Sequence, residues 1–292
     1  MAKKFPNTNC DNTYDTKSMK RGQVLIINNK FFNPPHKVRT GSEIDLKCLR
    51  ELFKQMHMEV EFHEDLDKSQ MEQVILQFAK FDAYKISDIC IIVIMSHGTE
   101  REKEQVVLDR YGQGLKTSWI EDQFNNVNCT LFSGKPKVLL YQLCRGKQPD
   151  FATTKIKDKE DATNDPNVVF TETDRNQNNA GLVETDSGLI FQTERRLEDM
   201  LVGYATQRGR QAHRDPILGS WYIQLICEVL MEKAHDTQLI EMLNEVDRKM
   251  KMLSSQDYTM QTSSYTSNGF NKSLYFNPGI YLDASGNVQK FI

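Results

Sequence analysis

The chain has 292 residues, of which 39% are hydrophobic and 26% charged, so it is long enough to bury a sizeable core. Its net charge of −3 provides no positive surface for nucleic acid or an anionic membrane, and no apolar run approaches the ~20 residues of a membrane span. The start lacks the apolar core of a signal peptide, and the six cysteines are scattered without metal-ligand spacing. We therefore expect a cytoplasmic protein with reduced thiols, no metal and no cofactor.

The first half of the chain predicts strands and helices in alternation. Residues 1–20 are polar and rich in turn-forming residues, which predicts a flexible lead-in. Repeated strand–helix–strand units indicate an α/β fold with a mainly parallel sheet and helices on both faces. Strands are expected at Gly22–Asn28, Met58–His63, Asp88–Met95 and Lys137–Tyr141. Helices are expected over Glu43–Met56 (with Ser42 as N-cap), from Ser69 or Asp67 to Ala83, and from Thr117 or Ser118 to Phe124. A hairpin is expected between Val106–Leu108 and Leu115–Thr117.

The pattern changes at Lys147. Residues 147–188 contain almost no periodic apolar positions, which is typical of a functional or disordered connection. They predict a linker between a large segment, 21–174, and a small segment, 187–292. In the small segment we expect a strand over Leu201–Thr206, a helix over Gly219–Lys233, a second helix from Asp236 or Thr237 to Met250, and a last strand over Ser273–Asn277.

Two predicted strands end in residues that can perform chemistry. Cys144 follows Lys137–Tyr141, and His97 follows Asp88–Met95. Taken alone, Cys144 is either a small core residue or a nucleophile. Because neighbouring parallel strands end at the same edge of a sheet, His97 can activate the Cys144 thiol there. The backbone N–H groups of Gly98 and Cys144 are the expected donors to an oxyanion.

These residues resemble the caspase family. The family's motif is Gln-Ala-Cys-Arg/Gln/Gly-Gly with a histidine about 50 residues earlier, and Gln142–Gly146 with His97 matches it. The departure is Leu143 in place of alanine, which we expect to point away from the cleft into packing and to adjust activity. The resemblance implies a three-layer sandwich with a six-stranded sheet. It covers roughly Arg21 to Pro278 and is greatest to insect initiator caspases, especially through Ala234–Thr237 and Gly269–Gly279.

The resemblance also implies a substrate pocket. Arg39 and Arg214 match the two pocket arginines of caspases, and Gln142 matches the glutamine between them. Two guanidinium groups and an amide can hold a buried substrate carboxylate. His213 stands where caspases often carry aromatic residues before the second arginine, so it is a candidate substrate contact, and the neighbouring subsite is left open. Two further residues are expected to be structural: Arg145 as a clamp on loops, and Trp221 as a packing residue.

By resemblance, the chain is an initiator-type caspase, a zymogen that cleaves after aspartate, or alternatively glutamate, and activates downstream caspases in apoptosis. The implied partners are protein substrates with an acidic residue at the cleaved position, including downstream caspases and the chain itself. Asp186 and, as a second candidate, Asp174 are the expected self-cleavage sites, unless this acidic stretch is an ordinary surface loop.

The resemblance further implies a homodimer in which Ser273–Asn277 pairs with its copy about a two-fold axis. An apoptosome-type adaptor would bind through a recruitment domain that the printed chain is too short to hold, so we expect this sequence to be a catalytic domain. Inhibitor-of-apoptosis proteins are further expected partners. Two alternatives stay open: a catalytically weak homologue acting as a decoy or dimerisation scaffold, and a flavodoxin-like small-molecule-binding protein, for which no phosphate-binding loop is found.

Overall fold

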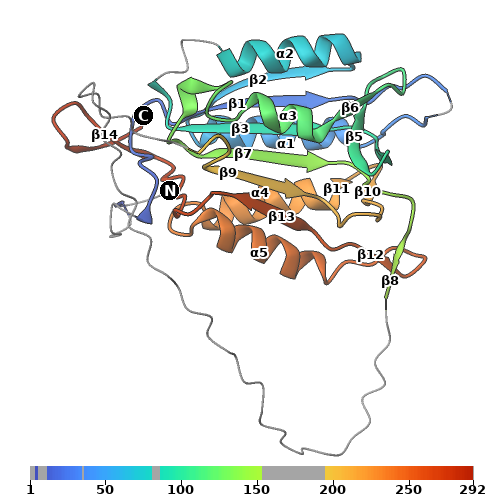
Figure 1. The fold of residues 1–292 in the computed structure, drawn as a ribbon. Helices are drawn as coiled ribbons and strands as arrows, with labels where there is room; N and C mark the ends of the chain where they lie inside the picture. The colour runs from blue at the N-terminus through green and yellow to red at the C-terminus, as the bar shows by residue number, and fades with distance from the viewer. Residues whose placement is uncertain (1–3, 6–11, 35, 81–85, 153–194, 292) are drawn as a thin grey trace, which may run out of the picture. The chain divides into compact units, whose positions relative to one another are not determined.

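A six-stranded sheet forms the centre of the fold (Figure 1). In spatial order its strands are β13 (Ser264–Asn268), β9 (Met200–Tyr204), β7 (Lys137–Gln142), β3 (Ile89–Met95), β1 (Gly22–Asn28) and β2 (Glu59–Glu64). Every neighbouring pair is parallel except β13 with β9. All residues of β1, β3, β7 and β9 are buried, as expected for parallel strands covered on both faces.

Helices cover both faces of this sheet, which confirms the predicted three-layer α/β architecture. One face carries α1 (Ser42–Gln55), α4 (Trp221–Lys233) and α5 (Leu239–Met250), and the other carries α2 (Lys68–Lys80) and α3 (Thr117–Gln123). Successive strand residues point to opposite faces, so Ile26 joins the first core and Leu25 the second. Burial of each such side chain stabilises the fold by about 1.5–3 kcal/mol.

Smaller elements surround the main sheet. β4 (Gly98–Arg101), β5 (Glu104–Leu108) and β6 (Gly114–Lys116) form an antiparallel sheet, in which the predicted hairpin is the pair β5 and β6. Three two-stranded pairs join β8 (Asp150–Phe151) with β12 (Thr259–Met260), β10 (Arg214–Asp215) with β11 (Gly219–Ser220), and β14 (Ile280–Leu282) with β15 (Val288–Lys290). A short 3₁₀ helix, η3, covers Thr130–Phe132.

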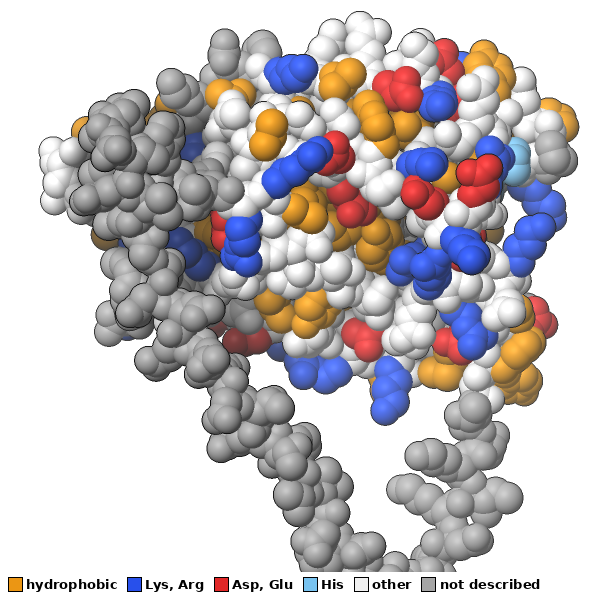
Figure 2. All heavy atoms as spheres, in the orientation of Figure 1, with side chains coloured by type: hydrophobic (Ala, Val, Ile, Leu, Met, Phe, Trp, Pro, Cys, Tyr) orange, Lys and Arg blue, Asp and Glu red, His pale blue; other side chains and the backbone are white. Residues whose placement is uncertain are grey.

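The structure describes residues 4–5, 12–34, 36–80, 86–152 and 195–291. The described residues up to Ala152 and from Arg195 onward belong to one unit. Within this part of the chain, every helix is too short or too polar to cross a bilayer. On the face drawn in Figure 2, basic and acidic side chains are interspersed, in line with the near-neutral net charge.

Helix α5 begins at Leu239 with Gln238 as its N-cap, rather than at Asp236 or Thr237, because the Gln238 side chain accepts the N–H of Ile240. Helices α1 and α4 also begin at different residues from those predicted, and in both cases a glycine explains the difference. Gly41, rather than Ser42, is the N-cap of α1, with φ of 91°. A Cβ at Gly41 would lie 2.4 Å from the Asp215 carbonyl oxygen, so the chain passes too close there for a larger residue. Helix α4 begins at Trp221 rather than at Gly219, because Gly219 has φ of 97° and belongs to β11, where it pairs with Asp215 of β10.

The predicted last strand is wrong. Ser273–Asn277 is not a strand of the main sheet, although Leu274 and Phe276 are buried in the core. The edge strand is β13, which pairs antiparallel with β9 and is largely exposed. Its sequence, Ser-Tyr-Thr-Ser-Asn, lacks an apolar run because an edge strand needs no burial on both faces. The expected pairing with a second copy was assigned to Ser273–Asn277, and that segment forms no strand of the main sheet through which to pair.

The predicted flexible lead-in also needs correction. Within the described stretch 12–20, Tyr14 is 3% exposed, and its hydroxyl donates to Asp199 Oδ1 at 2.9 Å. The backbone of Tyr14 donates to the Ser273 carbonyl at 3.0 Å. Thr16 is buried as well, and its hydroxyl donates to the Tyr275 carbonyl at 2.6 Å. This segment therefore packs against the small segment.

Candidate active site

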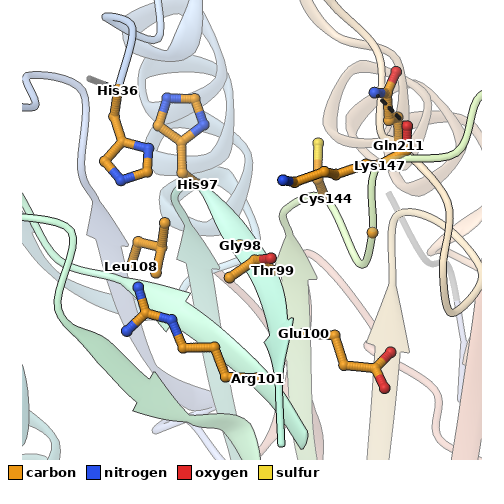
Figure 3. Close-up of a pocket in the computed structure, with 11 residues that line it drawn as sticks. His36, His97, Gly98, Thr99, Glu100, Arg101, Leu108, Cys144, Lys147 and Gln211 are labelled. Carbon is orange, nitrogen blue, oxygen red and sulfur yellow. Dashed lines mark hydrogen bonds between the residues drawn. The ribbon is translucent and has the colours of Figure 1, made fainter. Parts of the chain in front are cut away.

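Cys144 and His97 meet at the carboxyl edge of the main sheet. The strands that precede them, β7 and β3, are parallel neighbours with Met95 paired to Gln142. Both side chains line a cavity of about 480 Å³ and lie on opposite sides of it (Figure 3). Cys144 is partly exposed, whereas three other cysteines, Cys90, Cys129 and Cys227, are buried.

The imidazole of His97 is held by the loop that precedes α1. Its Nε2 lies 2.6 Å from the carbonyl oxygen of Lys37, and the ring of Phe32 lies 4.6 Å from the His97 ring, between centroids. Because a carbonyl can only accept, Nε2 carries the proton and Nδ1 is left as the basic nitrogen. Burial, together with Arg39 and Arg214, lowers the pKa of His97 to about 4. The ring is therefore neutral at pH 7.

The backbone N–H of Gly98 faces away from β5. The His97 carbonyl accepts the N–H of Leu108 at 2.9 Å, so these residues form a hydrogen-bonded pair. Hydrogen-bonded and non-hydrogen-bonded pairs alternate along an antiparallel ladder. The next pair, Gly98 with Val107, is therefore not hydrogen-bonded, and the Gly98 N–H points away from β5. A Cβ at Gly98 would lie 2.6 Å from the carbonyl oxygen of Cys144. Only glycine therefore lets this N–H approach the cysteine.

The loop that carries Cys144 is fixed to the small segment. Arg145 donates its N–H to the Arg210 carbonyl at 2.9 Å and accepts from the N–H of Gly209 at 3.0 Å. The Arg145 guanidinium stacks 3.9 Å from the centroid of Tyr204. A Cβ at Gly146 would lie 2.2 Å from the Gly209 carbonyl oxygen. Arg145 is thus the predicted clamp, and Gly146 allows the two backbones to approach.

A second cavity, of about 260 Å³, adjoins Cys144 and contains the predicted pocket residues. Arg39, Gln142, His213 and Arg214 all line it. Arg39 is 1% exposed, and its Nη1 donates to Asn28 Oδ1 at 3.1 Å and to the Asn29 carbonyl at 2.9 Å.

The second fork nitrogen of Arg39 has no hydrogen-bond partner among the described residues. The side-chain oxygen of buried Gln142 likewise has none there. Burial, with Arg214 as a second cause, lowers the pKa of Arg39 to about 9. The cavity therefore presents unsatisfied polar groups on buried side chains, and it is positively charged.

Asp45 ties the two halves of this cavity together. It lies in the first turn of α1 and accepts the Ser220 N–H at 2.8 Å, the Ser220 hydroxyl at 2.6 Å and Gln224 Nε2 at 2.8 Å, at the start of α4. Arg214 Nε donates to the Thr40 carbonyl at 2.9 Å. Burial raises the pKa of Asp45, which these hydrogen bonds oppose. The large and small segments are thus joined where the pocket is built.

Comparison with known proteins agrees with this geometry. The sequence model of the caspase domain, Peptidase_C14, matches residues 21–275. The chain belongs to the caspase family. The family is one of cysteine peptidases, and the central sheet has the arrangement of that fold.

Individual caspases are similar over most of this chain. Caspase Dronc of Drosophila melanogaster is 29% identical over 273 residues, which are 92% of this chain and 58% of the relative. Human caspase-9 is 31% identical over 247 residues, 82% of this chain and 58% of the relative. The crystal structure of the Drosophila initiator caspase Dronc aligns with a TM-score of 0.72 at 26% identity, covering 96% of this chain and 93% of that one. The chain therefore spans little more than half the length of these curated caspases.

Three residues discussed in the sequence analysis, His213, Trp221 and Leu143, have defined surroundings. His213 stacks on Trp221 with ring centroids 4.5 Å apart, and its Nε2 lies 3.2 Å from the Met260 carbonyl oxygen. Trp221 therefore packs, as predicted. Leu143 is 2% exposed and lies in the core, as predicted, but it also lines the smaller cavity and contacts Gly98, so it does not point wholly away from the cleft.

Some site features were missed from the sequence, and two candidates cannot be placed. The Lys37 carbonyl is a backbone atom on a loop, so no side-chain pattern signals it. Asp45 could have been noticed, because a carboxylate in the first turn usually faces solvent, whereas Asp45 occupies the buried face with Leu46 and Leu49. The candidate cleavage sites Asp174 and Asp186 lie outside the described residues.

Proposed function

We propose that this chain is an initiator-type caspase that cleaves protein substrates after aspartate and, by processing downstream caspases, acts in apoptosis in the cytoplasm. The observation that carries the proposal is the buried guanidinium of Arg39, which keeps one fork nitrogen unpartnered beside Cys144. A buried charge without a partner is costly, so this site is suited to an anion that enters with the substrate. The carboxylate of aspartate meets that requirement, with Arg214 and Gln142 completing its contacts.

The cleft supports nucleophilic catalysis by cysteine. Cys144 Sγ attacks the carbonyl carbon of the peptide bond, and its proton passes to the neutral Nδ1 of His97. The N–H groups of Gly98 and Cys144 stabilise the oxyanion. As the C–N bond breaks, His97 returns the proton to the leaving amine. Water, activated by the same imidazole, then releases the acyl group from sulfur.

His97 is placed for this role without a carboxylate partner. The Lys37 carbonyl fixes its tautomer, and burial together with the neighbouring arginines holds its pKa near 4, so it begins each cycle as a base. Transfer of the thiol proton makes an ion pair of thiolate and imidazolium. The low pKa of the free imidazole limits how much of that pair exists before substrate arrives.

We infer that the active form is a homodimer. β13 is an edge strand whose outer side has no partner among the described residues, and pairing it with its copy about a two-fold axis would continue the sheet. Self-cleavage after Asp186, or after Asp174, would cut the segment that connects Ala152 to Arg195 along the chain. Recruitment by an apoptosome-type adaptor and restraint by inhibitor-of-apoptosis proteins are part of this proposal and rest on the family resemblance alone.

Hydrolysis of an acidic tetrapeptide aryl amide by the wild type and by Cys144→Ala tests the proposal. Wild-type turnover that the variant lacks supports a cysteine endopeptidase. No turnover by a folded, dimeric wild type would instead favour the alternative of a decoy or dimerisation scaffold. Preference for lysine at the cleaved position would refute the basic pocket.

A further inference from the structure

Two cavities with different linings adjoin Cys144. They share only His97 and Cys144. The smaller cavity holds Arg39 and Arg214, so in the proposed function it takes the residue before the cleaved bond. A peptide that crosses Sγ must then place its leaving half in the larger cavity. That cavity is walled by β4 and β5, by His36, and by the loop after Cys144 (Figure 3).

The larger cavity is large enough to contact more than one residue of the substrate. The cavity has a volume of about 480 Å³, so a compact space of that size is about 8 Å across. An extended peptide advances about 3.3 Å per residue, so this width accommodates two to three residues beyond the cleaved bond. Leu108, 3% exposed, provides an apolar surface within it. His36 forms another wall, with its ring 5.8 Å from that of His97, between centroids.

The wall of this cavity carries uncompensated positive charge. Arg101 Nη2 donates to the Gly112 carbonyl at 2.9 Å, and its guanidinium lies beside Leu108 in Figure 3. Among residues whose positions are described, neither Arg101 nor Lys147 forms an ion pair with a carboxylate. Glu100 is the one acidic side chain lining the cavity there, and Arg208 already binds it at 3.0 Å.

We propose that this cavity binds the leaving half of the substrate and that Arg101, with Lys147, favours an acidic residue two or three positions after the cleaved bond. Arg101 is then a specificity residue for the proposed endopeptidase, and the inference rests on that function. The sequences after Asp186 (Ser-Gly-Leu) and Asp174 (Arg-Asn-Gln) contain no acid at these positions. The cavity therefore favours other proteins over the chain's own linker.

The test uses two internally quenched peptides that are identical except for glutamate or lysine at the third position after the cleaved aspartate. A tetrapeptide aryl amide, which has no residue beyond the bond, reports on the dyad and the smaller cavity. Arg101→Glu and the milder Arg101→Gln are compared with Lys290→Glu as the control. Lys290 is exposed in β15, which pairs with β14 at the end of the fold opposite to β5 and β6 (Figure 1).

For the wild type we expect kcat/KM to be about fivefold higher for the glutamate peptide at low salt, and the ratio to fall as salt is added. Arg101→Gln should bring the ratio close to one, Arg101→Glu should reverse it, and Lys290→Glu should leave it unchanged. A ratio near one in the wild type, or a ratio that Arg101→Glu retains, overturns the inference. If the wild type fails to hydrolyse the aryl amide, the proposed function itself has failed.

Discussion

Replacement of Arg39 by glutamine tests the pocket most sharply. The variant removes a guanidinium that would bind the substrate carboxylate through charge-assisted hydrogen bonds, each worth about 1.5–3 kcal/mol. Two such bonds amount to about 3–6 kcal/mol, or roughly 10²–10⁴-fold in kcat/KM. The assay compares reporters with aspartate and asparagine at the cleaved position. Arg39→Gln should lower only the aspartate value by this factor, because the amide carries no charge.

The same variant should be almost neutral for folding. Arg39 loses hydrogen bonds to Asn28 and Asn29, but an unpaired buried charge disappears as well. We therefore expect Tm to fall by no more than about 5 °C. Arg21→Gln is the matched control. Arg21 is 0% exposed, like Arg39 a buried arginine, but it precedes the amino end of β1, whereas Arg39 follows the carboxyl end. Equal losses for both reporters, or an equal effect of Arg21→Gln, would refute the role of Arg39.

The dyad, the glycine beside it and the sheet edge each allow one further test. Because the pKa of His97 is lowered to about 4, the neutral base persists as the pH falls, so kcat/KM should decline near pH 4; a decline near the ordinary value of 6.5 would contradict the burial argument. Gly98→Ala places a Cβ 2.6 Å from the Cys144 carbonyl oxygen and should lower kcat/KM about 100-fold without unfolding the protein; unchanged activity would exclude tight packing there. If β13 forms the dimer, Tyr265→Asp should weaken dimerisation in sedimentation about tenfold through like charges across the axis; an unchanged dimer would place the interface elsewhere.

The parts of the fold that sequence reasoning captured are those with buried apolar runs. The apolar run of β3 ends at Met95 and that of β7 at Tyr141, so the neighbouring ends of these strands, and the dyad with them, could be predicted. The pocket arginines required the family resemblance. Nothing in the local pattern distinguishes Arg39 from a surface arginine before a helix.

The parts that were missed lack a side-chain signal. β13 is polar because it pairs on one edge and is largely exposed, so no apolar period marks it. The Lys37 carbonyl acts through the backbone. Tyr14 lies in a polar segment that tertiary contacts fix in place, among them the hydrogen bonds of the Tyr14 hydroxyl to Asp199 and of the Thr16 hydroxyl to the Tyr275 carbonyl.

Covalent trapping measures the central claim, that Cys144 is a nucleophile directed to aspartate. The protein is treated with tetrapeptide halomethyl ketones ending in aspartate or asparagine, and the labelled site and rate are read by intact-mass and peptide-mapping mass spectrometry. The other cysteines serve as internal competitors, and among them Cys48 is partly exposed. We predict one label per chain, on Cys144, formed at least 100-fold faster by the aspartate compound. Labelling at Cys48, or equal rates for the two compounds, would contradict the account.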